Sequence, residues 1–205
     1  MKLFITGIGT DVGKTIASAI ITEALEADYW KPIQAGDLND SDSHKIESYV
    51  SNSKTIIHPN SYGLNTPASP HLAAELDQIT ISLDQIQEPQ TQNHLVVEGA
   101  GGVFVPLNDT DCVIDLIQPD YKVIVVSRHY LGSINHTLLT IEALKNRNLE
   151  IAGIVFNGNE NKATESIILN KTGIPYIGRI QQEPYFDKNV VREYADLFQE
   201  KMINL

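Results

Sequence analysis

The chain has 205 residues, of which 42% are hydrophobic and 20% are charged, and it carries a formal net charge of −11. This length suits one domain with a sizeable core. The negative charge excludes a surface built for nucleic acid or for an anionic membrane, because both need clustered lysine and arginine. No apolar run approaches the roughly 20 residues that a bilayer span requires.

The chain has one cysteine, Cys112, which cannot form an internal disulfide. The start of the chain lacks the basic and apolar regions of a signal peptide and leads directly into an apolar run at residues 3–5. A thiol without a partner is typical of a reducing compartment. We therefore expect a cytoplasmic protein.

The first motif lies between that apolar run and a helical pattern at residues 16–25. Residues 7–15 read Gly-Ile-Gly-Thr-Asp-Val-Gly-Lys-Thr. A strand, a glycine-rich turn that ends in Gly-Lys-Thr, and a helix are the context of a phosphate-binding loop. The free N–H groups and the dipole at the start of the helix attract an anion. Lys14 would reach the terminal phosphates of a nucleotide, and the hydroxyl of Thr15 would bind Mg²⁺.

This loop departs from the usual pattern G-x-x-x-x-G-K-[ST]. Ile8 occupies the place of the first glycine, so the loop measured from Gly7 is one residue longer. The position after a predicted strand still favours nucleotide binding over a chance Gly-Lys-Thr.

The remaining pattern alternates strands with helices. Strands are predicted at residues 28–33, 94–98, 121–127, 151–156 and 175–178, and helices at 42–50, 71–76, 83–86, 134–147, 162–169 and 190–202. Residues 51–70, rich in Ser, Asn and Pro, are predicted to be irregular. Continuous apolar strands between amphipathic helices indicate an α/β fold: a mostly parallel central sheet with helices on both faces. We predict one P-loop domain over residues 1–205.

Three chemically useful side chains fall near the carboxyl ends of predicted strands, where parallel α/β sheets bind ligands. Glu98 ends an apolar run before a glycine-rich segment and is predicted to bind Mg²⁺. Lys31 either stabilises a second anion or lies on the surface, and Asn157 ends another strand. Asp42, at a predicted helix start, is either a metal ligand or an N-cap.

Six segments resemble, in the same order, those of the dethiobiotin synthetase family. They are residues 7–15, Trp30-Lys31-Pro32-Ile33, Ser69-Pro70-His71, Glu98-Gly99-Ala100-Gly101-Gly102, Leu131-Gly132-Ser133-Ile134-Asn135-His136, and Asn157. The extra loop residue matches the spacing of that family. The resemblance implies ATP-dependent ring closure of 7,8-diaminopelargonic acid with CO2 to dethiobiotin, through a carbamate and a carbamic-phosphoric anhydride. Its partners would be ATP, the diamine and CO2 or bicarbonate, with Mg²⁺ as the cofactor.

The resemblance also implies a role for each site residue. Catalysis would involve Lys14, Lys31 and Thr10. The nucleotide would be bound by Thr10, Asp11, Val12, Gly13, Lys14, Thr15, Ile16, Glu98 and Asn157. Mg²⁺ would be held by Thr15, Asp42 and Glu98. The substrate would be bound by Lys31, Ala35, Ser69, Gly101, Gly102, Leu131, Gly132 and Asn135. The segment at residues 131–135 would act across the two-fold interface of a homodimer.

Two other functions remain as alternatives. One is a regulatory or partitioning ATPase of the same superfamily, which carries an additional signature lysine early in the loop. The corresponding residue here is Gly9, which favours the synthetase. The other is a catalytically inactive nucleotide-binding module. The presence of Lys14, Lys31 and Glu98 argues against that alternative.

Overall fold

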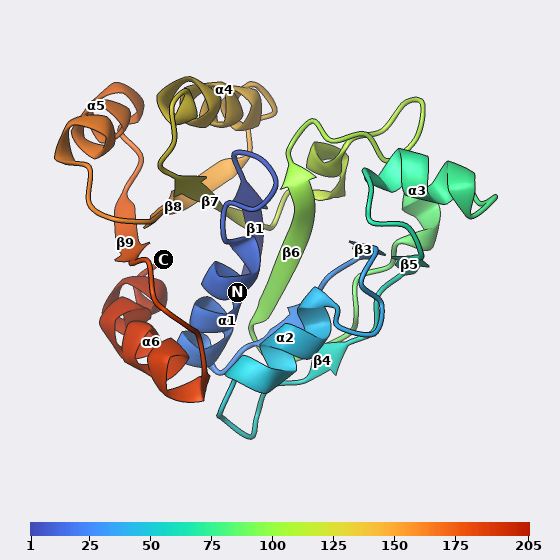
Figure 1. The fold of residues 1–205 in the computed structure, drawn as a ribbon, viewed down its shortest axis with the longest axis horizontal. Helices are drawn as coiled ribbons and strands as arrows, with labels where there is room; N and C mark the ends of the chain where they lie inside the picture. The colour runs from blue at the N-terminus through green and yellow to red at the C-terminus, as the bar shows by residue number, and fades with distance from the viewer.

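A seven-stranded parallel sheet forms the centre of the protein (Figure 1). The structure is a computed structural model that describes residues 1–205. The strands are β1 (Lys2–Gly7), β2 (Asp28–Trp30), β4 (Ile57–His58), β6 (Leu95–Gly102), β7 (Lys122–Arg128), β8 (Glu150–Asn157) and β9 (Tyr176–Ile180). Their spatial order is β4-β2-β6-β1-β7-β8-β9. Every pair is parallel, so all carboxyl ends lie along one edge of the sheet.

Helices cover both faces of this sheet, as the sequence predicts. The six α-helices are α1 (Lys14–Leu25), α2 (Asp42–Tyr49), α3 (Pro70–Leu76), α4 (Ser133–Asn146), α5 (Lys162–Thr172) and α6 (Lys188–Ile203), with short 3₁₀ helices at Leu83–Gln85 and Val113–Leu116. Helices α1, α2 and α6 pack against one another on one face, and α4 and α5 pack on the other (Figure 1). None of these helices combines the length and the apolar character that crossing a membrane requires.

The core is one continuous cluster of 49 buried hydrophobic residues. Phe4, Val97, Ile124 and Phe156, on four neighbouring strands, are each fully buried. Because the strands are covered on both faces, they are apolar throughout instead of alternating with polar residues. This single-domain α/β architecture confirms the predicted fold class.

The strand predicted at residues 28–33 is two strands in the structure. Strand β2 ends at Trp30, and β3 (Ile33–Ala35) pairs with β5 (Tyr62–Leu64) in a separate two-stranded sheet. Pro32 lies between them and has no N–H with which to continue a ladder. The prediction that residues 51–70 are irregular was also wrong in part, because β4 and β5 lie there and pair with β2 and β3.

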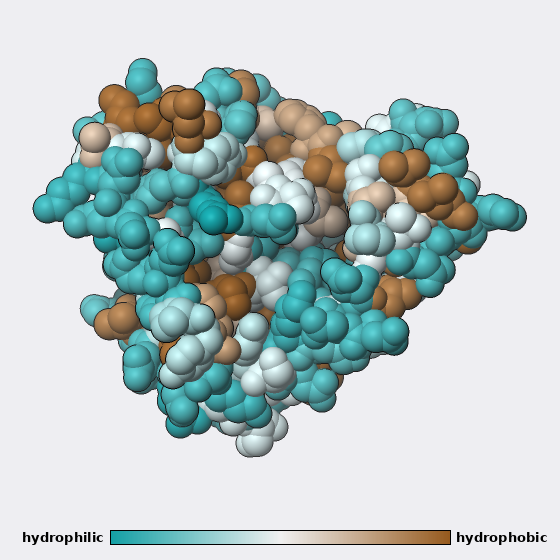
Figure 2. All heavy atoms as spheres, in the orientation of Figure 1, coloured by the Kyte–Doolittle hydropathy of each residue, from teal (hydrophilic) through white to brown (hydrophobic).

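Strand β6 continues four residues beyond its predicted end at Glu98. Its glycines permit close packing: a Cβ at Gly99 would lie 3.1 Å from the ring of Phe4. The remaining predicted elements agree with the structure to within a few residues. Space-filling atoms show a mainly hydrophilic surface with a hollow near the centre of the face in Figure 2.

Candidate active site

The phosphate loop connects β1 to α1 and has the geometry of an anion-binding turn. Asp11 and Gly13 adopt left-handed backbone conformations, with φ of 56° and 95°. A Cβ at Gly13 would lie 2.1 Å from the amide nitrogen of Asn157, so this position requires glycine. The backbone N–H groups of residues 9–13 donate to no protein acceptor, and α1 has no side-chain cap. The loop therefore presents a series of free donors at the positive end of a helix.

Lys14 begins α1 and is almost completely buried, with 8% of its surface exposed. Its Nζ donates to the carbonyl oxygen of Gly9 at 3.1 Å, a contact within the loop itself. Burial lowers the pKa of Lys14 to about 8, because the low-polarity surroundings disfavour the ammonium form. An anionic phosphate in the loop would provide the ammonium group of Lys14 with a charged partner.

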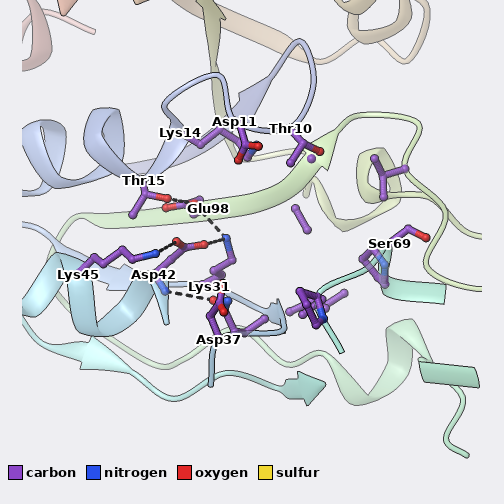
Figure 3. A pocket seen from close by; sticks show the side chains of 18 of the residues that line it. Thr10, Asp11, Lys14, Thr15, Lys31, Asp37, Asp42, Lys45, Ser69 and Glu98 are labelled. Atoms are coloured by element: carbon purple, nitrogen blue, oxygen red, sulfur yellow. Dashed lines mark hydrogen bonds and ion pairs between the residues drawn. The ribbon is translucent and has the colours of Figure 1, made fainter. Parts of the chain in front are cut away.

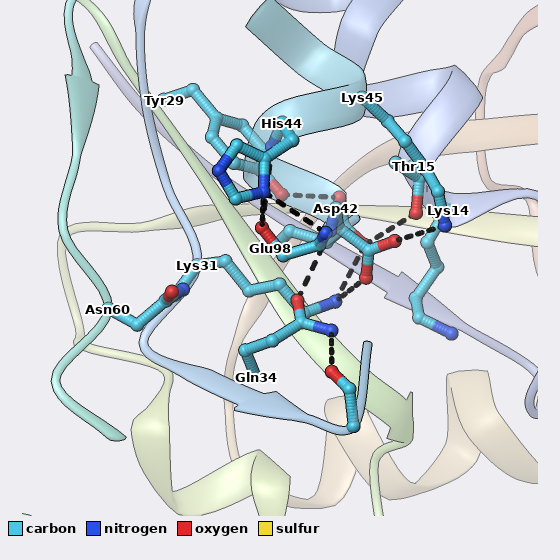
Figure 4. Close-up of polar contacts among 12 residues, drawn as sticks. Lys14, Thr15, Tyr29, Lys31, Gln34, Asp42, His44, Lys45, Asn60 and Glu98 are labelled. Carbon is cyan, nitrogen blue, oxygen red and sulfur yellow. Dashed lines mark hydrogen bonds and ion pairs between the residues drawn. The ribbon is translucent and has the colours of Figure 1, made fainter. Parts of the chain in front are cut away.

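Lys31 lies between two carboxylates at the centre of the site (Figures 3 and 4). Its Nζ donates to Asp42 Oδ2 at 2.5 Å and to Glu98 Oε1 at 3.0 Å. Burial alone lowers the pKa of Lys31, but the two carboxylates outweigh burial and raise the pKa above its ordinary value. The sequence leaves Lys31 as either a surface residue or a group that stabilises a second anion. The surface position is excluded, since only 5% of the residue is exposed.

Glu98 is the most heavily hydrogen-bonded of these groups. Besides Lys31, its Oε1 accepts from the hydroxyl of Thr15 at 3.0 Å, and its Oε2 accepts from the phenol of Tyr29 at 2.8 Å. Tyr29 is fully buried, and burial raises the pKa of its phenol well above the ordinary value, so the phenol stays neutral and donates. Both oxygens of this carboxylate accept hydrogen bonds, which fix its orientation.

Asp42 is the first residue of α2, and the N-cap is Ser41 instead. The hydroxyl of Ser41 accepts from the backbone N–H of His44 at 3.4 Å, so Asp42 is free for another use. Burial on its own raises the pKa of Asp42, but Lys31 lowers it below the ordinary value. The sequence leaves Asp42 as either an N-cap or a metal ligand, and the structure excludes the N-cap.

The donor set around Lys31 fits magnesium. Thr15, Asp42 and Glu98 offer a hydroxyl and two carboxylates, all hard oxygen ligands of the kind that Mg²⁺ takes alongside water and phosphate oxygens. No group of three or more His, Cys, Asp or Glu side chains gathers anywhere in the chain to form a cage made wholly of protein. One or two carboxylates are what Mg²⁺ usually takes from a protein when a nucleotide and water supply the other oxygens.

These groups open into one cavity of about 680 Å³ at the carboxyl edge of the sheet. The cavity brings together twelve of the predicted site residues, which are Thr10, Asp11, Gly13, Lys14, Thr15, Ile16, Lys31, Ala35, Asp42, Ser69, Glu98 and Gly101. Figure 3 shows Thr10 and Asp11 above this space, Ser69 at its right and Lys31 below, beside Asp42. A nucleotide and a small second substrate could thus meet at Lys31.

Three other predicted residues lie beside the cavity without lining it. Val12 is buried beneath the loop, and Asn157 donates from its amide to the carbonyl oxygen of Val12 at 2.8 Å. Gly102 is the register partner of Gly7 on the neighbouring strand. Asn157 and Gly102 thus adjoin the loop from neighbouring strands.

The segment at residues 131–135 is not brought to this cavity. Leu131 is completely exposed, Gly132 has a left-handed conformation with φ of 103°, and Asn135 lies on the exposed first turn of α4. Tyr130 and Ile134 are also exposed large side chains. Within a single chain, this part of the predicted substrate site is separate from the rest.

The cavity also contains residues that the sequence did not indicate. Gln34 accepts from the N–H of Asp42 at 3.3 Å and so holds the start of α2. Lys45 lies one turn after Asp42, with its Nζ 3.8 Å from Asp42 Oδ1, and Asp37 occupies a left-handed turn at the cavity wall. Helical spacing from Asp42 could have identified Lys45, and Gln34 directly follows the family segment at residues 30–33, whereas Asp37 carries no local signal.

Comparison with known proteins identifies the family. A family model described as an AAA domain matches residues 1–190. The ATP-dependent dethiobiotin synthetase BioD of Christiangramia forsetii is 55% identical over 98% of both chains. The chain belongs to the dethiobiotin synthetase family. The dethiobiotin synthetase of Cytophaga hutchinsonii is 54% identical over 95% of both chains, and that of Chlamydia abortus is 42% identical over 98% of this chain and 95% of its own.

Solved structures of more distant proteins share the fold. A putative plasmid partition protein from Borrelia burgdorferi bound to AMPPNP has a TM-score of 0.60 at 14% identity, covering 99% of this chain and 98% of its own. The septum site-determining protein MinD of Pyrococcus horikoshii, complexed with Mg-ADP, has a TM-score of 0.61 at 13% identity, covering 100% of this chain and 96% of its own. At these identities the likeness establishes the architecture alone.

Proposed function

We propose that this member of the dethiobiotin synthetase family is itself an ATP-dependent dethiobiotin synthetase. It closes the ureido ring of dethiobiotin from 7,8-diaminopelargonic acid, CO2 and ATP, and it releases ADP and phosphate. One observation carries the proposal: a phosphate loop and the buried Lys31 line the same cavity, which is large enough for a nucleotide and a second substrate. The names of the close relatives give the reaction its identity.

The chemistry needs no nucleophile from the protein. One substrate amine attacks CO2 and loses a proton to give a carbamate. A carbamate oxygen then attacks the γ-phosphorus of ATP, and ADP leaves. The second amine attacks the carbonyl carbon of this anhydride, phosphate leaves with the C–O bonding pair, and the amine loses its proton as the ring closes. The protein must hold these groups in line and neutralise charge.

The residues of the cavity suit those tasks. Lys14 and the N–H groups of the loop would bind the β- and γ-phosphates, and the hydroxyl of Thr10 would lie beside the γ-phosphate. Lys31 would stabilise the carbamate where it meets that phosphate. Mg²⁺ held by Thr15 and the two carboxylates would add positive charge on the phosphate oxygens.

Substrate binding is proposed to involve two copies of the chain. Ala35, Ser69 and Gly101 line the cavity, with Gly102 beside them. The segment at residues 131–135 would reach a neighbouring copy's cavity, where the free N–H groups at the start of α4 suit the substrate carboxylate. The exposed Leu131 and Ile134 support such a homodimer, because large apolar side chains at the surface favour an interface.

The adenine base would be recognised by Asn157. Its amide uses one N–H for the carbonyl of Val12, which leaves the second N–H and the carbonyl oxygen for the base. Residues 1–205 would act as one functional domain, and we extend the proposal to a cytoplasmic location on the basis of the single, half-buried cysteine.

The partitioning-ATPase alternative has only the shared fold in its favour. Gly9 stands where such ATPases carry their signature lysine, and a Cβ at this position would meet nothing within 4 Å. Packing therefore leaves space for a larger residue there. Because packing does not force a glycine at position 9, the missing lysine counts as evidence against a partitioning ATPase.

The decisive assay measures phosphate release from MgATP and bicarbonate with and without 7,8-diaminopelargonate. The proposal predicts release only when the diamine is present, since the carbamate is the acceptor of the phosphoryl group. A control with pelargonate, which lacks both amines, should stay at background. Hydrolysis at a similar rate without the diamine would refute the synthetase function and favour a regulatory ATPase.

A further inference from the structure

The outward-facing side of the phosphate loop is held by two side chains from neighbouring strands. Arg128 ends β7 and Asn157 ends β8, and the two are register partners in the sheet. The guanidinium Nη1 of Arg128 donates to the carbonyl oxygen of Asp11 at 3.0 Å. The amide of Asn157 donates to the next carbonyl along, that of Val12, at 2.8 Å. Consecutive carbonyls of the loop are thus each fixed by one strand end.

The loop needs such support because its conformation is unfavourable by itself. Asp11 is a non-glycine residue in the left-handed region, with φ of 56°, which ordinarily costs roughly 1 kcal/mol or more. Gly13 is also left-handed. The N–H groups of residues 9–13 have no protein acceptor, and to bind one anion together they would have to converge on it. A free loop would sample other conformations in which they do not.

We infer that Arg128 is a positioning residue for nucleotide binding, which acts with Asn157 as a two-point clamp on the carbonyls of Asp11 and Val12. With both carbonyls drawn outward, the N–H groups of the loop face inward before any phosphate arrives. Arg128 is itself exposed and does not line the cavity, so its action passes through the loop backbone. This inference deepens the proposed function and uses only its premise that the loop binds a nucleotide.

The clamp also connects the loop to the surface of the proposed homodimer. Arg128 lies three residues before Leu131, and the N–H of His129 donates to the carbonyl of Asn157 at 3.3 Å. A displacement of the segment after β7 would therefore move the donor that holds Asp11. A short, continuous run of backbone therefore connects the proposed substrate segment at residues 131–135 to the residue that holds the phosphate loop.

The test compares Arg128→Ala with wild type in two measurements that need no turnover. Calorimetry should give a dissociation constant for MgADP raised about fivefold, as expected for loss of one charge-assisted hydrogen bond at an exposed site. Hydrogen–deuterium exchange of the ligand-free protein should become faster in a peptide covering residues 8–16, with the rest of the chain unchanged. Thermal unfolding should be nearly unaltered, because the exposed side chain of Arg128 makes no other hydrogen bond and the substitution leaves its backbone pairing in β7 intact.

Two further variants separate the clamp from other effects. Arg147→Ala is the matched control, since Arg147 is an exposed arginine whose Nη1 contacts Asp115 at 2.7 Å far from the loop, and it should leave both readouts unchanged. Arg128→Lys keeps the charge but loses the planar donor, and it should restore affinity only in part. Full restoration by lysine, together with loss of the Arg128→Ala effect at high salt, would overturn the clamp in favour of simple charge attraction.

Equal MgADP affinity and equal loop exchange in Arg128→Ala and wild type would also overturn it. Failure of the proposed function has a different signature. A wild-type protein that binds no MgADP would refute the nucleotide site, whereas exchange at residues 8–16 would still report whether Arg128 holds the loop.

Discussion

The phosphate-loop end of the cavity and the end near Ser69 are built from different kinds of structure. At the loop end, the side chains hold one another in place: Lys31 contacts two carboxylates, and Glu98 accepts from Thr15 and Tyr29. At the other end, the wall consists of short segments around residues 33–37 and 67–70, attached through the two-stranded sheet of β3 and β5. The candidate residues at 131–135 lie elsewhere on the surface.

The two ends therefore receive their substrates in different ways. A nucleotide meets a site whose donors and carboxylates are already oriented within one chain, which keeps the cost of ordering low. The second substrate meets a wall of short segments that, in the proposed homodimer, a second copy of the chain would complete. We therefore expect substitutions at the loop end to change chemistry in each subunit, and substitutions at residues 131–135 to change assembly and substrate affinity together.

The largest effect is expected from Lys31→Ala. Removing this ammonium should lower kcat by roughly 10²–10³-fold, because it takes away a preorganised positive group at the position of the carbamate. MgADP binding should be largely retained, since the loop and Lys14 are intact. Steady-state phosphate release and calorimetry test the two halves of this prediction.

Lys45→Ala is the matched control for charge in the cavity. Lys45 also lines the cavity but lies 3.8 Å from Asp42 and is about one-third exposed, so its loss should matter much less. A parallel loss of nucleotide binding in Lys31→Ala would contradict its role beside the carbamate, and an equally severe Lys45→Ala would show that any positive charge near Asp42 serves.

The next effect is expected from Leu131→Asp. Burying a leucine in an interface contributes roughly 2 kcal/mol, so a charge there should weaken dimerisation by more than tenfold. Analytical ultracentrifugation should show monomers, and diamine-dependent turnover should fall while MgADP affinity is unchanged. Leu197→Asp, at a leucine of α6 that is 73% exposed, is the control and should alter neither. A dimer that survives Leu131→Asp would contradict the two-copy substrate site.

A smaller effect concerns pH. Because burial lowers the pKa of Lys14 to about 8, the free protein loses this ammonium as the pH rises through that value. The affinity for MgADP should therefore fall by up to about tenfold per pH unit above 8, since the bound anion favours the charged form. Lys14→Arg, which stays charged, should give a flat profile over the same range. A wild-type profile as flat as that of the variant would show that Lys14 does not bind the phosphates.

The lowered pKa of Lys14 makes the free energy of unfolding rise with pH, whereas the affinity for MgADP falls. The unfolded chain keeps a proton on this lysine up to its ordinary pKa of 10.5, so between about 8 and 10.5 the unfolded state binds more protons than the folded state. The contribution of Lys14 to the free energy of unfolding therefore rises with pH across that window. Chemical denaturation of wild type and Lys14→Met at several pH values would measure it.

The smallest effect is expected from Tyr29→Phe. This change removes the donor to Glu98 Oε2 and leaves a buried carboxylate oxygen without a partner, which should lower the free energy of unfolding by about 1–3 kcal/mol. Tyr62→Phe, whose phenol contacts Gln85 at a more exposed position, should cost less. If the two variants are equally stable, Tyr29 does not hold the carboxylate in place.

The sequence predicts the parts of this molecule that rest on local pattern. The loop, Lys31, Glu98 and the order of the main strands follow from apolar runs and from the residues at their ends. Strands β4 and β5 were missed because they have two and three residues and are stabilised by pairing with β2 and β3, which no local periodicity records. Tertiary contacts decide such short strands.

The same limit applies to the site. Tyr29 and Arg128 each act through one side-chain hydrogen bond, to groups 69 and 117 residues away along the chain, and neither belongs to a motif. Gln34 holds α2 through a bond to the N–H of Asp42, eight residues away. Conversely, residues 131–135 form a clear motif that one chain does not bring to the cavity. Motifs thus indicated which residues matter, whereas the structure was needed to find which of them meet.

The most direct test of the account follows the carbon atom that closes the ring. Wild-type protein would be incubated with MgATP, 7,8-diaminopelargonate and ¹³C-labelled bicarbonate, and the products analysed by mass spectrometry alongside phosphate release. We expect dethiobiotin that carries the label in its ureido carbonyl, formed in equal amount to phosphate. Phosphate release with no labelled dethiobiotin, or with a product that lacks the label, would contradict it.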